Sequence, residues 1–163
     1  MNVIFLDVDG VLNSRFWNDT HQMEISKGRY IDIENVRALA ELVRKTGSQI
    51  ILHSGWRFWF DDNLAPTNEE SQYLVNLLNN EGMVISGFTP DLTTEEIRKT
   101  KKFSKVKADE ILTWLQKHPE TENWVVLDDL DLHNDIVEKH QVRTDPECGL
   151  TEEDVEKSVK ILN

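Results

Sequence analysis

The hydrophobic positions of the chain follow two periods that alternate along its length. Runs dominated by consecutive apolar residues, typical of strands buried on both faces of a parallel sheet, occupy residues 3–6, 48–53, 83–86, 124–127 and 141–144. Apolar residues at helical spacing occupy 33–46, 67–82, 107–118, 132–139 and 151–162. The alternation predicts an α/β fold in which helices cover both faces of a parallel five-stranded sheet.

Capping residues mark where several of these helices begin and end. Asp32 is a suitable N-cap for the helix at 33–46, and Gly47 ends it. A capping box, Thr67-Asn-Glu-Glu70, is expected to open the second helix. Thr151 begins the last helix in the same way, and a short helix is expected from residues 93–96.

Polar residues follow three of the predicted strands at the point where each strand ends. Asp7 and Asp9 follow the first strand, Ser54 follows the second, and the pair Asp128-Asp129 follows the fourth. Ligands of such sheets bind beyond the carboxyl ends of the strands, so these residues are expected to meet at one edge. Four carboxylates in one place repel one another unless a cation lies among them, and oxygen ligands favour Mg²⁺. Asp7, Asp9, Asp128 and Asp129 are therefore the candidate metal ligands.

Composition limits the remaining possibilities. We expect a single domain over residues 1–163, and a net charge of −12 excludes a general binder of duplex nucleic acid. No apolar run approaches the roughly 20 residues that span a bilayer, so no membrane partner is expected. The single cysteine, Cys148, and a first strand without a secretion signal are consistent with a reducing cytoplasm. The oligomeric state stays open.

The run Val3-Ile-Phe-Leu-Asp7-Val-Asp9-Gly-Val-Leu12 resembles the first motif of the haloacid dehalogenase-like hydrolases, which are mostly phosphatases. The other motifs follow in order along essentially the whole chain. The stretch Ser54-Gly-Trp-Arg57 resembles capless members, similar to phosphatase modules of nucleic-acid end-repair proteins. The resemblance implies a Rossmann-like three-layer α/β/α core with strand order 5-4-1-2-3, no large cap domain, a flap at residues 14–30, and Mg²⁺ as cofactor.

The same resemblance implies roles for individual residues. Asp7 corresponds to the nucleophile and Asp9 to the general acid and base, while Ser54 corresponds to the serine that binds a phosphoryl oxygen. An active-site lysine is required, and Lys107 is preferred over Lys105 and Lys102 because it is expected to open the helix before the Asp-Asp strand. Asp129 is favoured over Asp128 as a direct metal ligand. The substrate-binding candidates are Ser54, Gly55, Arg57 and Lys105.

Several residues have an alternative interpretation. Arg57 suits a phosphate clamp and a surface arginine equally well, and a structural role is favoured for His53. For the aromatic residues 56–60, core packing is favoured over base stacking. The basic stretch 98–107 is either a solvated surface or a collector of a polyanionic substrate.

Together these features predict a Mg²⁺-dependent phosphatase that forms an aspartyl-phosphate and acts on nucleic-acid end phosphates or another large phosphorylated substrate. Small-metabolite and phosphoprotein phosphatases are the alternatives within the same chemistry. A non-catalytic phosphate- or metal-binding module is a further alternative. A receiver-type domain phosphorylated on aspartate is disfavoured, because the third strand is expected to end in Ser86-Gly87 where such domains carry the aspartate.

Overall fold

The computed structural model describes residues 1–14 and 31–163. The flap expected at 14–30 therefore lies, apart from its first residue, outside the described residues. In chain order the elements are β1 (Asn2–Leu6), α2 (Ile33–Thr46), β2 (Gln49–Leu52), the 3₁₀ helix η1 (Gly55–Trp59), α3 (Glu69–Asn80), β3 (Ile85–Phe88), α4 (Glu95–Thr100), α5 (Phe103–Gln116), β4 (Asn123–Asp128), α6 (Asp135–Glu138), β5 (Gln141–Arg143) and α7 (Glu152–Leu162).

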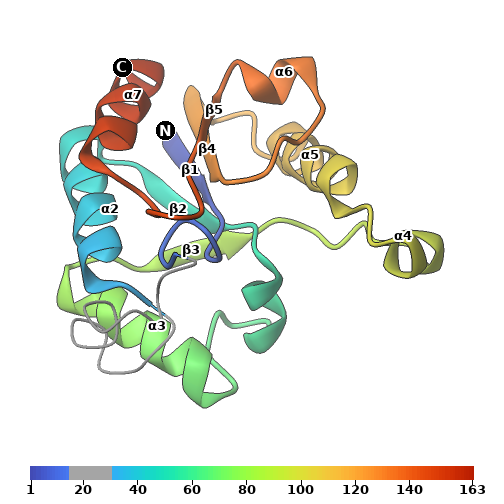
Figure 1. Ribbon diagram of the computed structural model, residues 1–163, viewed down its shortest axis with the longest axis horizontal. Coiled ribbons are helices and arrows are strands. Elements are labelled where there is room, and N and C mark those ends of the chain that lie inside the picture. The colour runs from blue at the N-terminus through green and yellow to red at the C-terminus, as the bar shows by residue number, and fades with distance from the viewer. Residues whose placement is uncertain (15–30) are drawn as a thin grey trace.

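The five strands form one parallel sheet in the order β3-β2-β1-β4-β5, which is the expected order read from the opposite edge. Helices α2, α3 and α7 pack on one face, and α5 and α6 on the other, as Figure 1 shows. The strand β1 lies at the centre, hydrogen-bonded to β2 on one side and to β4 on the other. The chain folds as the Rossmann-like three-layer core that the sequence predicts, and its described connections add no further sheet.

The side chains of β1 divide between the two cores. Ile4 and Leu6 pack into the core under α2, α3 and α7, whereas Val3 and Phe5 pack into the core under α5 and α6. All four side chains are fully buried. Burial on both faces explains why this strand is continuously apolar, and it places the polar residues that follow at the edge of the sheet.

Two of the predicted N-terminal helix caps are confirmed, whereas the bounds of several other elements differ from the prediction. α2 begins after Asp32, whose carboxylate accepts a hydrogen bond from Glu34 N at 2.8 Å, and α7 has the capping box at Thr151. The cap of α3, in contrast, is Asn68 and not Thr67, because Asn68 Oδ1 accepts from Ser71 N while the Thr67 hydroxyl donates to Trp59 O.

The bounds of α6, β3 and α5 also differ from the prediction. α6 spans Asp135–Glu138 and not 132–139, because Asn134 Oδ1 accepts from Ile136 N and Val137 N and caps the helix there. β3 spans Ile85–Phe88 and not 83–86, because Met83 N is still bonded to Leu78 O at the end of the preceding helix. Thr89 follows the strand, so no acidic residue stands at its end. α5 begins at Phe103, four residues before the predicted start, and this places Lys107 in its second turn. The short α4 has no buried residue and projects from the body of the molecule (Figure 1).

Candidate active site

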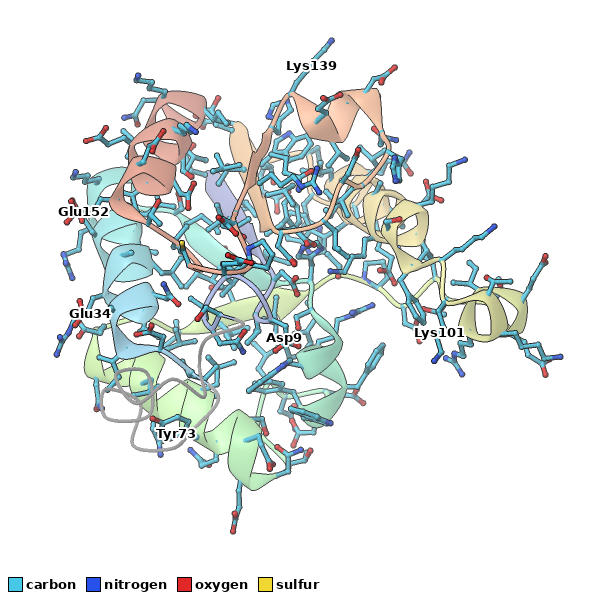
Figure 2. The ribbon with its side chains drawn as sticks, viewed as in Figure 1. Asp9, Glu34, Tyr73, Lys101, Lys139 and Glu152 are labelled. Atoms are coloured by element: carbon cyan, nitrogen blue, oxygen red, sulfur yellow. The ribbon has the colours of Figure 1, made fainter. Side chains whose placement is uncertain are left out.

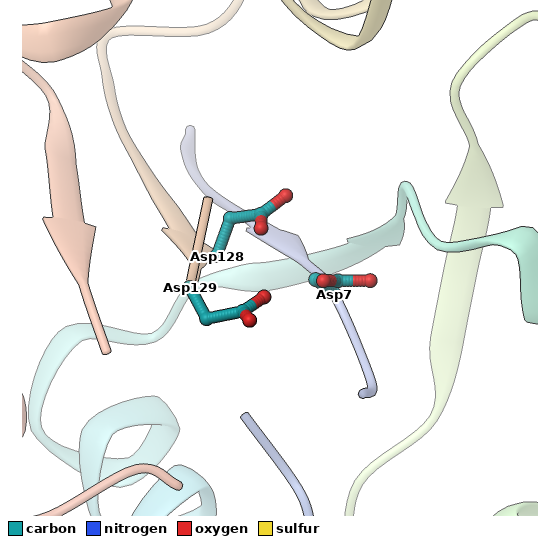
Figure 3. A group of neighbouring side chains, drawn as sticks. All are labelled: Asp7, Asp128 and Asp129. Carbon is teal, nitrogen blue, oxygen red and sulfur yellow. The ribbon is translucent and has the colours of Figure 1, made fainter. Parts of the chain in front are cut away.

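The strand order brings the polar residues at the strand ends together. Asp7 follows β1. Asp128 is the last residue of the neighbouring β4, and Asp129 follows it. Figure 3 shows the three side chains around one point at this edge of the sheet. Carboxylate oxygens of the three residues lie within 4.8 Å of one another. An all-oxygen donor set of this size fits a hard divalent cation such as Mg²⁺.

Lys107 reaches the same point from α5. Its Nζ lies 2.8 Å from Asp128 Oδ2 and 3.4 Å from Asp7 Oδ2. Burial of Lys107 opposes its charge, but the carboxylates of Asp7 and Asp128 outweigh this effect and raise its pKa above the ordinary value. The ammonium therefore stays charged and ties the ends of β1 and β4 together.

Asp128 is the most constrained carboxylate of the group. Besides Lys107, it lies 3.1 Å from His53 Nε2 and accepts a hydrogen bond from Leu130 N at 2.9 Å. Burial opposes ionisation of Asp128, yet the contact with His53 and the charge of Lys107 lower its pKa below the ordinary range. His53 is itself fully buried, and burial lowers its pKa, so it is a neutral residue that orients Asp128. This arrangement agrees with the structural role favoured for His53.

Asp7 and Asp129 are affected in the opposite direction. Without a cation, burial and the nearby charge of Asp128 raise the pKa of Asp7 to about 8, although Lys107 opposes the shift. Burial and Asp128 also raise the pKa of Asp129 to about 6. Burial is the largest cause of both shifts. The site also holds three clustered carboxylates against the single ammonium of Lys107. A bound divalent cation would supply the missing positive charge.

Asp9 has a different environment from the three clustered carboxylates. Its side chain is exposed and is not part of the group of oxygens that Asp7, Asp128 and Asp129 form. It accepts hydrogen bonds from Asn13 Nδ2 at 3.0 Å and from Trp56 Nε1 at 3.3 Å. Two donors thus fix a carboxylate that faces the solvent side of the site. Neither donor was among the predicted site residues. The bond from Trp56 spans 47 positions and leaves no local pattern, whereas Asn13 lies only four residues from Asp9 and was not singled out.

The backbone conformation at Gly10 and the close approach of Asp129 both require glycine at this position. Its φ is +82°, in the left-handed region that glycine tolerates best. A Cβ at this position would lie 2.6 Å from Asp129 Cγ, so a side chain would displace this carboxylate. Gly10 therefore allows the loop after β1 to pass against Asp129.

Ser54 and Arg57 form the wall next to the carboxylates. Ser54 Oγ accepts a hydrogen bond from Trp56 N and begins η1. Arg57 is buried, donates to Ser54 O at 2.9 Å through Nη1, and pairs with Glu110 at 2.8 Å through Nη2. The interpretation of Arg57 as an ordinary surface arginine is therefore wrong.

Glu110 is a site residue that the sequence did not single out. It is buried, and its Oε2 also accepts a hydrogen bond from Leu92 N at 2.9 Å. Burial raises the pKa of Glu110, and the bonds from Leu92 and Arg57 oppose the shift without cancelling it. The one available signal was its spacing of three residues from Lys107, which puts both side chains on one face of α5.

These residues line a cavity of about 640 Å³ at the carboxyl edge of the sheet. Its lining includes every predicted site residue except Lys105 and Asp128: Asp7, Asp9, Ser54, Gly55, Arg57, Lys107 and Asp129. Lys105 is exposed and lines a separate cavity with Lys102. Of the aromatic residues in 56–60, Trp56 and Phe60 are buried, whereas Phe58 is 58% exposed and lines the cavity. Packing therefore explains some of these aromatic residues and not all.

A family of known proteins matches most of the chain. The family model described as "HAD domain in Swiss Army Knife RNA repair proteins" matches residues 3–155, from β1 into α7. No curated protein and no solved structure matches the chain. Across the described ranges 1–14 and 31–163, no helix combines the length and apolarity needed to cross a bilayer.

Proposed function

The chain belongs to the family of HAD domains in Swiss Army Knife RNA repair proteins, and from this we propose that it is a Mg²⁺-dependent phosphatase acting through an aspartyl-phosphate. The observation that carries the proposal is the position of Asp7. Its carboxylate lines the cavity, contacts Lys107 and shares the cluster with Asp128 and Asp129. A carboxylate in this position can reach a phosphorus atom that enters from the solvent side.

In the first step, an oxygen of Asp7 attacks phosphorus and the bond from phosphorus to the leaving oxygen breaks. Asp9 gives its proton to that oxygen, which departs as an alcohol. In the second step, the Asp9 carboxylate takes a proton from water, whose oxygen attacks phosphorus and releases inorganic phosphate and free Asp7. Asn13 and Trp56 suit this role of Asp9, because they hold its carboxylate by two hydrogen bonds while leaving it exposed.

The charges around Asp7 support the transfer of a phosphoryl group. Lys107, which contacts Asp7, would neutralise a phosphoryl oxygen, and Ser54 lines the same cavity. Asp7, Asp128 and Asp129 are the residues that would hold Mg²⁺, which supplies charge neutralisation to the phosphoryl group when it is bound. His53 contacts Asp128 and helps to lower the pKa of this carboxylate.

The proposed substrate is a phosphate displayed on a large molecule, in first place a nucleic-acid end. The description of the matching family refers to RNA repair, and the cavity lining includes the exposed aromatic side chain Phe58. A small phosphorylated metabolite or a phosphoprotein is the alternative substrate within the same chemistry.

The test is hydrolysis of an aryl phosphate with and without Mg²⁺ by the wild type and by Asp7→Asn. Metal-dependent release of phosphate that disappears in the variant supports the mechanism, whereas normal turnover in Asp7→Asn overturns it. A 3′-phosphorylated oligonucleotide serves as the second substrate. If the wild type releases phosphate from neither substrate, the phosphatase proposal fails and a non-catalytic phosphate-binding module is favoured.

A further inference from the structure

The segment from the end of α4 into α5 carries a concentration of positive charge, of which the proposed chemistry uses only Lys107. Residues 98–107 contain six basic residues and no acidic one, in a chain of net charge −12. Three of the six are paired with carboxylates: Arg98, Lys99 and Lys107. The other three are exposed and take part in none of the ion pairs among the described residues: Lys101, Lys102 and Lys105. We call these three lysines the basic elbow.

The basic elbow lines a second cavity, of about 720 Å³, that adjoins the candidate active site. Val106 contributes to the lining of both cavities, and the consecutive residues Phe103 and Ser104 contribute to one each. Glu96 and Asp109 also line the second cavity, so the net charge of its lining is only modestly positive despite the three lysines. A ligand that enters the first cavity can therefore continue over the basic elbow without leaving the surface.

The backbone of Lys101 adopts a left-handed conformation that is unfavourable for lysine. Lys101 ends α4 with a φ of +55°, a position where glycine is the usual residue. Lysine accepts strain there that glycine would avoid. The sharp turn directs the chain from the projecting α4 into α5, and it leaves Lys101 at the base of the projection (Figure 2).

Exposed aromatic side chains line the first cavity together with the carboxylates. Phe103, the first residue of α5, is 40% exposed and lines the first cavity, as does Phe58. Exposed aromatic rings beside unpaired cations are the combination that binds single-stranded nucleic acid, because bases stack on the rings while phosphates meet the cations. In a duplex the bases are already stacked, and the acidic body of the protein would repel the second strand.

We infer that the basic elbow binds the phosphodiester groups of a single-stranded nucleic acid whose terminal phosphate occupies the cavity at Asp7. This inference rests on the proposed phosphatase function, because it assigns that site a substrate class. The terminal base contacts Phe103 or Phe58, and the following phosphates contact Lys101, Lys102 and Lys105. The balance of charge predicts a modest affinity that falls steeply with salt.

The kinetic test compares two triple variants with the same loss of charge. In the elbow variant, Lys101, Lys102 and Lys105 become Gln. In the control, three exposed lysines outside residues 98–107 become Gln: Lys117, Lys139 and Lys160. The ratio of kcat/KM for terminally phosphorylated single-stranded oligonucleotides to that for an aryl phosphate should fall about tenfold or more in the elbow variant and stay unchanged in the control. Oligonucleotides phosphorylated at the 5′ and at the 3′ end are both measured, and thermal unfolding confirms that each variant folds.

Binding provides a readout that does not depend on turnover. Fluorescence anisotropy of a labelled single-stranded oligonucleotide is followed against salt concentration with the wild type and both variants. Each phosphate contact contributes about 0.7 to the slope of log K against log salt, so the elbow variant should lose about 2 from the slope.

The outcomes separate the two proposals. If only the elbow variant loses slope of log K against log salt, and the wild type hydrolyses no phosphomonoester, the nucleic-acid surface is supported and the phosphatase is rejected. If the wild type hydrolyses phosphomonoesters, and both triple variants change the salt slope and the kcat/KM ratio equally, the phosphatase is supported and the role of the basic elbow is overturned. If the elbow variant loses as much activity toward a phosphopeptide as toward the oligonucleotides, the assignment to nucleic acid is overturned.

Discussion

The substitution Asp7→Asn should abolish activity and at the same time stabilise the protein when no divalent cation is present. Burial raises the pKa of Asp7 from an ordinary value of 3.8 to about 8 in the folded protein. The unfolded chain therefore ionises Asp7 readily at neutral pH, while the folded protein resists ionisation. A carboxyl group whose pKa is raised by folding lowers the free energy of unfolding as the pH rises above about 4, and this loss of stability levels off above about pH 8. Asparagine has nearly the same size and carries no charge, so it removes the penalty.

The magnitude follows from the same two values. At about 1.36 kcal/mol per pH unit, the separation between them corresponds to an upper bound of about 6 kcal/mol near pH 8. The loss of one partner of Lys107 and relaxation of the site reduce this figure, and we expect a gain of about 2–4 kcal/mol in the free energy of unfolding. Because Asp7 is also the proposed nucleophile, the same variant should lose at least about 10³-fold in kcat/KM.

The assay is urea unfolding with a chelator at about pH 8 and again at about pH 5, where the gain should shrink to about 0.5–1 kcal/mol. Asp9→Asn is the matched control. It removes a carboxylate from the same loop, but Asp9 is exposed, so activity should fall while stability changes by less than about 1 kcal/mol. An Asp7→Asn protein that is no more stable than wild type near pH 8 would refute the reasoning, because the buried charge would then cost the fold nothing.

Three further predictions follow from particular contacts. Gly10→Ala should cost about 2–3 kcal/mol, measured by thermal unfolding, because strain at φ +82° adds to a clash with Asp129; Gly82→Ala, with φ +77° and open space around it, should cost only about 1 kcal/mol. Trp56→Phe removes the bond from Nε1 to Asp9 and should lower kcat about tenfold and alter its pH profile, while KM stays nearly constant. Addition of Mg²⁺ should raise the unfolding temperature of the wild type more at about pH 8 than at about pH 6, because the cation offsets the ionisation penalty of Asp7; an equal rise at both values would contradict this.

The sheet and the meeting of the strand ends could be predicted from the sequence because both depend on regular patterns. The continuous apolar run at residues 3–6 predicts a strand buried on both faces, and the structure confirms it. The strand order comes from the family resemblance and not from these patterns. In that order the strands that lead to Asp7 and Asp128 are neighbours, and they pair residue by residue from Asn2↔Asn123 to Leu6↔Leu127. Burial and strand order suffice for this inference, because neither depends on the conformation of individual side chains.

The contacts between side chains could not be predicted in the same way. The ion pair between Arg57 and Glu110 joins residues 53 positions apart, and nothing in the local sequence around either residue indicates the other. Lys107 is a case in which the prediction names the residue that the structure places at the cluster, but for a reason that the structure corrects. It is turned toward the carboxylates by the phase of α5, which it shares with Glu110 and Ile111, and not by a position at the start of the helix.

The balance of charge at the site also bears on the order in which ligands can bind. Asp7, Asp128 and Asp129 place three carboxylates against one ammonium. Burial, together with the charge of Asp128, raises the pKa of Asp7 to about 8. A phosphomonoester near neutral pH brings further negative charge to the same cavity. Its binding is unfavourable until a cation has neutralised the carboxylates, because like charges in a partly buried site are poorly screened. We therefore expect the affinity of this site for inorganic phosphate to depend on Mg²⁺, and in Asp7→Asn, where one carboxylate is absent, we expect that dependence to weaken.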